Sequence, residues 1–264
     1  MILYLAFNGN YQNLLRPIKA NILKSYAPDY RPNTIKILGE EPWPARYFLD
    51  SGAFTAFTKK QEINIAEYAE FIQKHRTRIA VAANLDAIGN AEATWQNQLT
   101  LESLGVDVLP VYHYGEPKSY LERYVAKYRY IAIGGLVPVS RKRKAMTAFL
   151  DYVFGYVRGR ALLHGFGVNG LWAWKRYPFY SVDATSWLIG SRVRQVQEWD
   201  GRDFHEHTRL TRTPQGFMAA TCHHNEINLN QARTYMTAAQ YITDMWTARG
   251  IDYANETDGP IKRS

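Results

Sequence analysis

The sequence has a single cysteine, Cys222, in 264 residues. One cysteine excludes an internal disulfide and is typical of a reducing compartment, so we expect a cytoplasmic protein. No apolar run approaches the roughly 18 residues that a membrane-spanning helix requires, and we therefore expect no membrane partner. The apolar segment 2–7 is short and has no basic leader, which predicts a buried strand rather than a signal peptide.

The sequence also lacks internal repeats and any linker rich in proline, glycine or serine. Hydrophobic residues make up 46% of the chain, which is enough for a complete core. We therefore predict one domain over residues 1–251, followed by a flexible tail over residues 252–264.

Acidic residues are outnumbered, with 24 Asp and Glu against 32 Lys and Arg, and the net charge is +8. A basic surface suits a polyanionic partner, and the 14% of aromatic residues offers rings on which bases could stack. This balance favours a nucleic-acid partner. The alternative is ordinary surface charge that keeps the protein in solution.

Strand-like and helix-like segments alternate along the chain, a pattern typical of a parallel α/β fold. The predicted strands are 2–7, 47–49, 79–85, 106–112, 130–133, 161–163 and 179–182. Helices are predicted between them, the first near 16–26, and a last helix at 225–249. This number of units predicts an α/β protein of the (β/α)₈ TIM-like barrel type, with an irregular eighth strand after Trp187 and a hairpin within 201–220.

Three of the strand-like runs end in an aspartate: Asp50, Asp86 and Asp183. The carboxyl ends of parallel strands face one crevice, where α/β enzymes place their chemistry. A single aspartate at this place is also a common helix cap. Three of them together favour an enzyme built on converging carboxylates.

Other residues near these strand ends are candidates for substrate binding. Ser51 and Phe54 follow Asp50, and the Phe54 ring could face a base. His113 ends the strand at 106–112, where the alternative is a structural or solvated histidine. The glycines Gly134 and Gly135, followed by Leu136, would allow a planar ligand to approach the backbone; the alternative is a turn that requires positive φ.

Four consecutive cations, Arg141, Lys142, Arg143 and Lys144, follow Ser140, which we expect to cap a helix. Positive charge at the start of a helix opposes the helix dipole, and a bound phosphate would relieve this conflict. We therefore expect the four cations to contact a nucleic-acid backbone. A solvated charge run is the alternative.

The sequence gives little indication of a metal site or a cofactor site. The candidate metal ligands are His205, His207, Cys222, His223 and His224, and their spacing matches no zinc pattern. The glycines at 165–170 match G-x-G-x-x-G, but an aromatic segment follows them and no acidic residue lies at the offset a dinucleotide site requires. We expect neither a metal nor a cofactor.

In order, the segments DSGAFT, ANLDAIG, PVYHYGE, IGGL, HGFG and YSVDAT resemble the motifs of the tRNA-guanine transglycosylase superfamily. The resemblance runs from about residue 47 to residue 187. It implies a (β/α)₈ barrel that exchanges guanine for a 7-deazaguanine base without a redox cofactor.

The resemblance also implies roles for individual residues. Asp183 corresponds to the nucleophile that attacks the sugar C1′, and Asp50 to the acid/base residue. Asp86 corresponds to the acceptor for the guanine edge, whereas His113 stands where the tRNA enzymes carry a glutamine. Residues 134–136 correspond to the backbone segment that contacts the exchanged base.

The chain departs from the tRNA enzymes in two ways. It is short, and it has only Cys222 where they carry a C-x-C-x-x-C…His zinc site. Both features are more similar to the compact phage and bacterial branch that modifies DNA with a preQ0-type 7-deazaguanine. The alternatives are the same reaction on tRNA, an inactive barrel that binds nucleic acid, and an N-glycosidase that stops at hydrolysis. No feature of the sequence predicts the oligomeric state.

Overall fold

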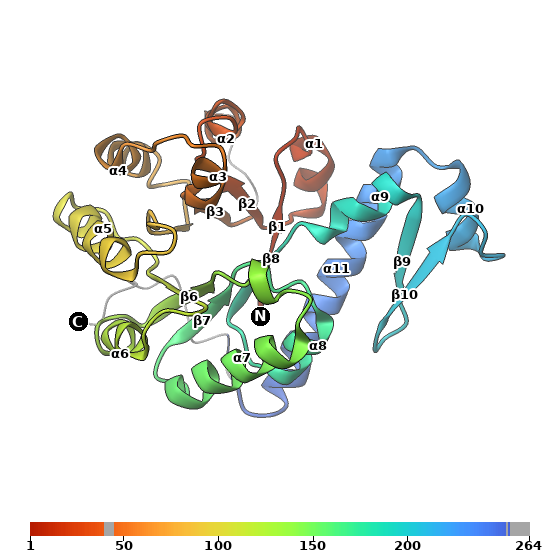
Figure 1. Ribbon diagram of the computed structural model, residues 1–264. Coiled ribbons are helices and arrows are strands. Elements are labelled where there is room, and N and C mark those ends of the chain that lie inside the picture. The colour runs from red at the N-terminus through yellow and green to blue at the C-terminus, as the bar shows by residue number, and fades with distance from the viewer. Residues whose placement is uncertain (40–44, 252, 254–264) are drawn as a thin grey trace.

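The computed structural model describes residues 1–39, 45–251 and 253. Eight parallel strands form one curled sheet in the order β4-β3-β2-β1-β8-β7-β6-β5 (Figure 1). The strands are β1 (Ile2–Ala6), β2 (Ile22–Ser25), β3 (Tyr47–Asp50), β4 (Val81–Ala82), β5 (Val111–His113), β6 (Tyr130–Gly134), β7 (Leu162–Gly165) and β8 (Ser181–Ala184). The predicted parallel α/β sheet of TIM-like type is confirmed.

The sheet is not closed by a continuous ladder. Its two edge strands, β4 and β5, are joined only by an isolated parallel bridge between Ala83 and Leu109. Two backbone hydrogen bonds flank this bridge, from Asn84 N to Leu109 O at 2.9 Å and from Leu109 N to Ala82 O at 2.7 Å. Because β4 has only two residues, the pairing does not extend further.

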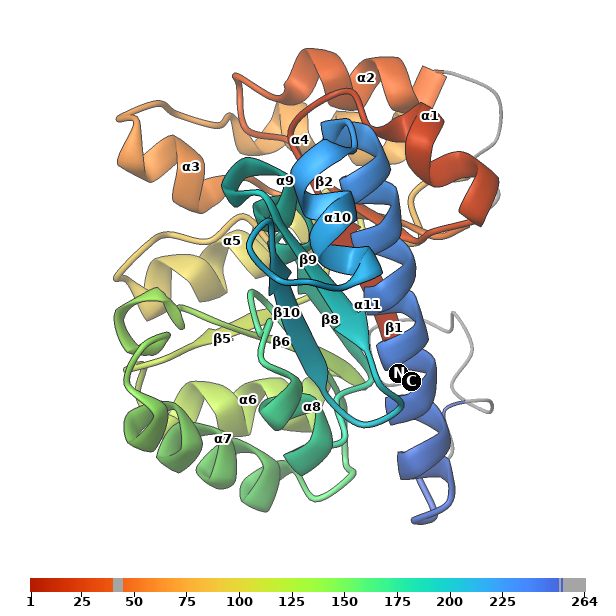
Figure 2. The same cartoon turned by 90° about the vertical axis from the view of Figure 1, so that its right-hand side faces the viewer.

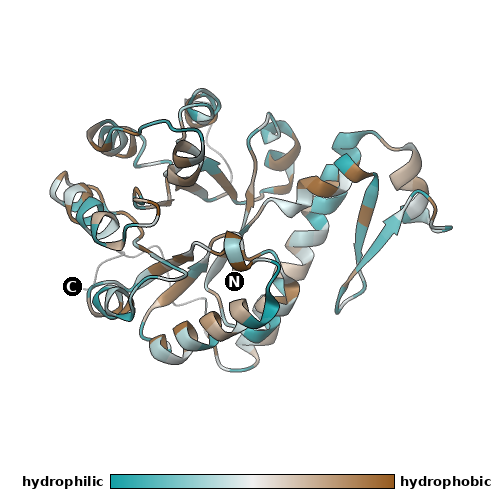
Figure 3. Cartoon of the chain, viewed as in Figure 1, coloured by the Kyte–Doolittle hydropathy of each residue, from teal (hydrophilic) through white to brown (hydrophobic). Residues whose placement is uncertain are grey.

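Helices connect consecutive strands and surround the outside of the sheet (Figure 1). They are α1 (Gln12–Leu15), α2 (Arg31–Gly39), α3 (Ala53–Thr58), α4 (Ile65–Lys74), α5 (Ala91–Ser103), α6 (Lys118–Lys127), α7 (Arg143–Val157), α8 (Leu171–Arg176) and α9 (Ile189–Val193). Figure 3 shows that these helices carry both hydrophobic and hydrophilic residues. In α4, for example, Tyr68, Ala69 and Ile72 are buried at helical spacing.

The second strand corrects the sequence analysis. Instead of a helix over 16–26, the chain forms the short helix α1, a 3₁₀ turn at Arg16–Ile18 and then β2. The turn ends at Lys19, whose φ of +53° is left-handed. Because β2 was missed, the strand expected to be seventh is in fact β8, and among the residues described after Trp187 no irregular strand joins the sheet.

After β8 and α9, residues 195–221 form an arm beside the sheet. Strands β9 (Gln195–Trp199) and β10 (Phe204–Thr208) pair antiparallel, and helix α10 (Pro214–Thr221) follows them. The predicted hairpin over 201–220 is therefore correct only in part. The long helix α11 (His224–Thr247) agrees with the predicted last helix, and Figures 1 and 2 show the arm lying against it.

The arm packs against α11 around a small separate apolar core, formed by Val196 and Ala219 of the arm and Ile227 of α11. Most of the other buried apolar residues form one core around the sheet and under the helices. The predicted tail at 252–264 lies outside the described residues, except for Tyr253. Within the described ranges, no helix is long and apolar enough to cross a membrane.

Candidate active site

The three predicted aspartates lie at the carboxyl end of the sheet. Asp50 is the last residue of β3, Asp183 lies in β8, and Asp86 lies in the loop that follows β4. Burial raises the pKa of Asp50 most, and the nearby charges of Asp86 and Asp183 add to the rise, as expected for carboxyl groups at the same end of the sheet.

None of these aspartates caps the helix that follows it. The N-cap of α3 is Gly52, and the 3₁₀ turn after β8 begins at Thr185. Helix α5 is capped by Asn90, whose side chain accepts a hydrogen bond from Ala93 N at 3.0 Å. The capping alternative is therefore wrong for Asp50, Asp86 and Asp183, and their carboxyl groups need another explanation.

Asp50 has the strongest electrostatic perturbation of the three. Burial raises its pKa from 3.8 to about 7, while hydrogen bonds from the Gly52 amide and the Ser25 hydroxyl oppose the shift. Ser25 ends β2 and pairs directly with Asp50 across the two strands. A carboxyl group with this pKa can both donate and accept a proton near neutral pH, which is the requirement for an acid/base catalyst.

The turn after β3 fixes the position of Asp50. Gly52 has a φ of +78°, and a Cβ atom there would lie 2.4 Å from the backbone nitrogen of Ala27. The carbonyl of Asp50 accepts a hydrogen bond from Tyr26 N at 2.8 Å. The turn is thus pressed against the end of β2, and only glycine fits at its second residue.

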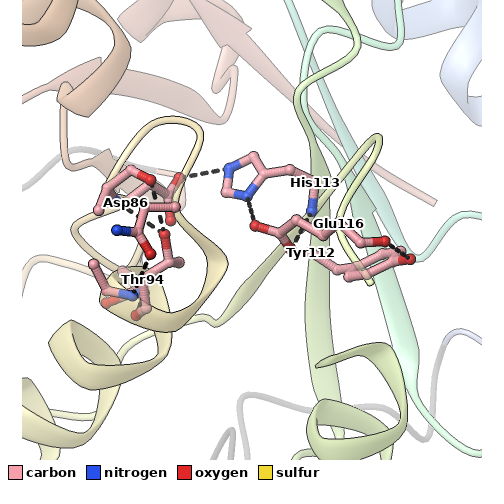
Figure 4. Close-up of polar contacts among 9 residues, drawn as sticks. Asp86, Thr94, Tyr112, His113 and Glu116 are labelled. Atoms are coloured by element: carbon pink, nitrogen blue, oxygen red, sulfur yellow. Dashed lines mark hydrogen bonds and ion pairs between the residues drawn. The ribbon is translucent and has the colours of Figure 1, made fainter. Parts of the chain in front are cut away.

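His113 lies between two carboxylates (Figure 4). Its Nε2 is 3.1 Å from Asp86 Oδ2, and its Nδ1 is 2.9 Å from Glu116 Oε1. Since carboxylates only accept, both ring nitrogens must donate, and the ring is an imidazolium. Burial opposes this charge, yet Asp86 and Glu116 together raise the pKa of His113 to about 10.

Asp86 keeps one carboxylate oxygen available. Its Oδ1 is buried and has no hydrogen-bond partner among the residues that the structure describes. Burial raises the pKa of Asp86, and the His113 imidazolium counteracts this rise by stabilising the carboxylate. Thr94 holds the same loop in place, because its hydroxyl accepts a hydrogen bond from Ala87 N at 3.0 Å. A ligand that donates a hydrogen bond would satisfy the free oxygen.

The two glycines at the end of β6 make room for His113. A Cβ atom on Gly134 would lie 3.1 Å from His113 Cδ2, and one on Gly135 would lie 3.0 Å from His113 Cβ. Gly135 has a φ of +67°, so the turn that requires positive φ is present. The carbonyl of Gly134 accepts a hydrogen bond from Tyr114 N at 3.0 Å, and Leu136 is buried. Contact of this segment with a planar ligand stays a prediction.

The candidates next to Asp50 differ in exposure. Phe54, on α3, is 53% exposed, whereas Ser51 is buried at 1%. Contact of the Phe54 ring with a base stays a prediction, and Ser51 does not reach the surface. The loops after β5 and β6 add the exposed side chains of Tyr114 and Val137, which the sequence analysis did not single out.

The Asp183 carboxylate is contacted by the loop after β7 and by a histidine of β7. The Gly167 amide donates a hydrogen bond of 2.7 Å to Asp183 Oδ1, and His164 Nε2 lies 3.6 Å from the same oxygen. His164 lies in the motif HGFG and Glu116 in PVYHYGE, but neither residue was predicted to act in the site. For Glu116, its spacing of three residues from His113 across a tight turn was the available signal.

The four cations of the basic segment (Arg141–Lys144) are exposed at the start of α7. The predicted Ser140 cap is wrong, because the Ser140 hydroxyl donates to Val137 O and the N-cap, Lys142, makes no side-chain capping bond. The first turn of α7 contains no acidic residue, and the Arg143 guanidinium lies 4.1 Å from the centre of the Trp172 ring.

The histidines considered as metal ligands have separate contacts. His205 pairs with Asp200 at 2.6 Å and His207 with Glu198 at 3.0 Å, both on the arm. His223 caps α11, together with Glu226. Within residues 1–39, 45–251 and 253, no group of three or more His, Cys, Asp or Glu side chains is placed to hold a metal ion.

The carboxyl end of the sheet thus combines a carboxyl group that titrates near neutral pH, a carboxylate supported by an imidazolium, and a third carboxylate held by a backbone amide. No protein-family model matches the chain, and no curated protein sequence matches it.

Proposed function

We propose that the protein is a pentosyltransferase that replaces guanine in DNA with a 7-deazaguanine of the preQ0 type. The observation that carries the proposal is the set of three aspartates at the carboxyl end of the sheet, none of which caps a helix. Their environments differ in the way that a two-step exchange requires. The ordered resemblance of the strand-end motifs supports the same reaction class.

In the first step, Asp183 attacks the sugar C1′ of the target nucleotide. The bond from C1′ to the guanine nitrogen breaks, and an aspartyl–sugar ester forms. Protonated Asp50 gives its proton to the departing guanine and becomes a carboxylate. A group whose pKa is about 7 is suited to this transfer.

In the second step, the incoming base gives its proton to the Asp50 carboxylate. The freed nitrogen of the base attacks C1′ and displaces Asp183, which regenerates both aspartates. Two displacements at one carbon give net retention of configuration. The step needs no oxidant, reductant or metal.

Asp86 would read the base. Guanine and 7-deazaguanines present a donor–donor edge, made of N1–H and the exocyclic amino group, and a carboxylate accepts from both. The free, buried Oδ1 of Asp86 fits this role. His113, as an imidazolium on Oδ2, keeps Asp86 in the accepting form.

The basic segment and the exposed Phe54 support a nucleic-acid substrate. Four exposed cations at a helix start would contact backbone phosphates, and an aromatic ring at the rim of the site would stack on a base that has left the duplex. DNA is the proposed substrate and tRNA the second candidate.

The test is incorporation of labelled guanine, and of labelled preQ0, into purified duplex DNA and into tRNA. We expect label in DNA only, and no incorporation by Asp183→Ala. Asp50→Asn should lower the rate by about 100-fold or more. Denatured samples of the unaltered protein, incubated with DNA in the absence of free base, should retain DNA attached through the ester. Asp50→Asn should retain less, because Asp50 supplies the proton in the ester-forming step.

Each rival function predicts a different result. Label in tRNA alone keeps the mechanism and replaces the substrate. Release of guanine without uptake of a base identifies an N-glycosidase. Binding of DNA without either reaction, unchanged by Asp183→Ala, identifies an inactive barrel and contradicts the proposal.

A further inference from the structure

Three buried polar side chains on neighbouring strands form a hydrogen-bonded chain that leads to Asp183. The hydroxyl of Tyr130, on β6, is hydrogen-bonded to Ser181 Oγ on β8. Ser181 Oγ lies 2.7 Å from Nδ1 of His164, on β7. Ser181 and His164 are completely buried and Tyr130 is 7% exposed, so water does not supply alternative partners.

The second ring nitrogen of His164 points toward the carboxylate of Asp183. Nε2 lies 3.6 Å from Asp183 Oδ1, and it is buried with no hydrogen-bond partner in the described part of the chain. The rings of Phe48 and Phe166, at 4.7 and 4.5 Å between centroids, hold the imidazole in this orientation. A small rotation of the carboxylate brings the pair within hydrogen-bond distance, as happens in many sites when substrate binds.

The direction of each hydrogen bond follows from what the groups can donate. The Tyr130 and Ser181 hydroxyls can each donate or accept, so the direction is set at the Asp183 end, where a carboxylate requires a donor. With the His164 proton on Nε2, Nδ1 accepts from Ser181, and Ser181 accepts from Tyr130. The other tautomer would direct a lone pair at a carboxylate. Burial lowers the pKa of His164, which favours the neutral ring, while the nearby Asp183 carboxylate opposes this shift.

We propose that His164 is a positioning residue for the nucleophile: the relay Tyr130–Ser181–His164 presents an N–H to Asp183 Oδ1. This inference rests on the proposed function, because it concerns the aspartate assigned to attack C1′. Oδ1 also accepts from Gly167 N, so both hydrogen bonds act on the same oxygen. The relay therefore leaves Oδ2 as the attacking atom and fixes its direction.

The first test needs no substrate. In ¹⁵N-labelled protein, long-range ¹H–¹⁵N correlation spectra distinguish the two histidine tautomers and the imidazolium; the His164 signal is assigned by its loss in His164→Asn. We expect the neutral ring with the proton on Nε2. A proton on Nδ1, or a charged ring, would overturn the inference, whatever the reaction proves to be.

The second test separates positioning from packing. Tyr130→Phe removes the first donor of the relay, and Tyr4→Phe is the matched control. Tyr4 is a buried tyrosine that packs against His164, with centroids 6.2 Å apart, but it lies outside the relay. For the single-turnover formation of the aspartyl–sugar ester, we expect Tyr130→Phe and Ser181→Ala to lower the rate by about tenfold or more with KM unchanged, and Tyr4→Phe to leave it unchanged.

Equal rates for Tyr130→Phe and Tyr4→Phe, at equal folded fractions, would overturn the relay. If the unaltered protein forms no ester and exchanges no base, the proposed function fails, while the tautomer spectrum still decides whether His164 presents its N–H to Asp183. The two failures are therefore distinguishable.

Discussion

At the scale of single residues, the Asp50 carboxyl group links folding to pH. Its pKa in the folded protein, about 7, is above the ordinary value of 3.8, so the folded state binds the proton more tightly than the unfolded state. The free energy of unfolding that Asp50 contributes is therefore highest below pH 4, falls as the pH rises, and reaches its minimum above pH 7.

Asp50→Asn should remove this dependence. Relative to the unaltered protein, we expect the variant to gain stability between pH 4 and pH 7, on the order of a few kcal/mol in total. Urea unfolding at several pH values measures the difference. Glu122→Gln, which changes an exposed carboxylate on α6, is the control. Its stability relative to the unaltered protein should not change between pH 4 and pH 7. A flat difference for Asp50→Asn would contradict the shifted pKa.

Lys24 is the opposite case, a buried cation. Its side chain is fully buried, its Nζ donates to Phe7 O at 2.9 Å, and burial lowers its pKa from 10.5 to about 7. The unfolded state therefore binds the proton more tightly between pH 7 and 10.5. The charge on Lys24 therefore destabilises the folded protein fully below pH 7, and this effect disappears as the pH rises toward 10.5.

Lys24→Met keeps the length of the side chain and removes the charge. We expect a gain on the order of 2 kcal/mol at pH 6, since the lost charge penalty exceeds the lost hydrogen bond, and a smaller gain or a loss at pH 10. Thermal unfolding at both pH values provides the measurement. Lys36→Met, on the exposed side of α2, should show no such difference between the two pH values.

The positions of the site aspartates were predictable because each ends a short apolar strand. Their partners were not. His164 is identified only by the atoms that surround it, because no local pattern distinguishes a histidine in a relay from one that fills space. For Glu116, the spacing of three residues from His113 was the one available signal. The expected cap at Ser140 was also wrong, because the Ser140 hydroxyl donates to the Val137 carbonyl instead of accepting from a helix amide.

At the scale of elements, the turn between β3 and α3 determines where Asp50 lies. A side chain on Gly52 would combine a left-handed φ with a backbone clash against Ala27. We expect Gly52→Ala to destabilise the fold by more than about 2 kcal/mol and to abolish exchange, because the turn must move away from β2.

Gly105→Ala is the matched control for the turn. Gly105 has a φ of +79°, nearly the same as Gly52, but an added Cβ would meet only a flexible glutamine side chain at 3.6 Å. It should cost about 1 kcal/mol and leave activity intact. Equal effects of the two substitutions in chemical unfolding would show that the contact with Ala27 is unimportant.

Strand β2 shows why one element escaped prediction. Its four residues, Ile22–Ser25, include a lysine, which interrupts the apolar run expected of a buried strand. Local preference favoured continuing the helix, whereas the sheet requires a strand between β1 and β3. Lys24 is accepted there because its ammonium reaches a carbonyl and the face of the Phe7 ring.

At the scale of the whole molecule, the basic segment should dominate the salt dependence of nucleic-acid binding. Neutralising Arg141, Lys142, Arg143 and Lys144 to glutamine should weaken DNA binding and lower the slope of log affinity against log salt by roughly 3 to 4. Fluorescence anisotropy with a duplex of fixed length measures both quantities.

The control removes the same charge elsewhere. The residues Lys36, Lys74, Arg76 and Arg158 are also exposed, and they lie where helices lead into the amino ends of strands, away from the site. Changing these four to glutamine should lower the slope much less. Equal slopes for both quadruple variants would show that only net charge matters.

The overall architecture could be predicted because the alternation of strands and helices spans the whole chain. The open edge between β4 and β5 could not, since it depends on a two-residue strand and a single bridge between Ala83 and Leu109. The arm was predicted only as a hairpin, because its helix α10 packs on a small separate core that leaves no periodic pattern in the sequence.

The place of β1 in the middle of the sheet has a consequence for how the protein is made. One side of β1 pairs with β2, but the other pairs with β8, about 180 residues later, and the Trp187 indole donates to the carbonyl of Ala6 at 3.0 Å. During synthesis, the side of β1 that pairs with β8 therefore stays unpaired until residue 184 has left the ribosome. Contacts of such long sequence separation slow folding and expose the nascent chain to aggregation. Synthesis in the presence of a chaperone that covers apolar segments should accordingly raise the yield of folded protein.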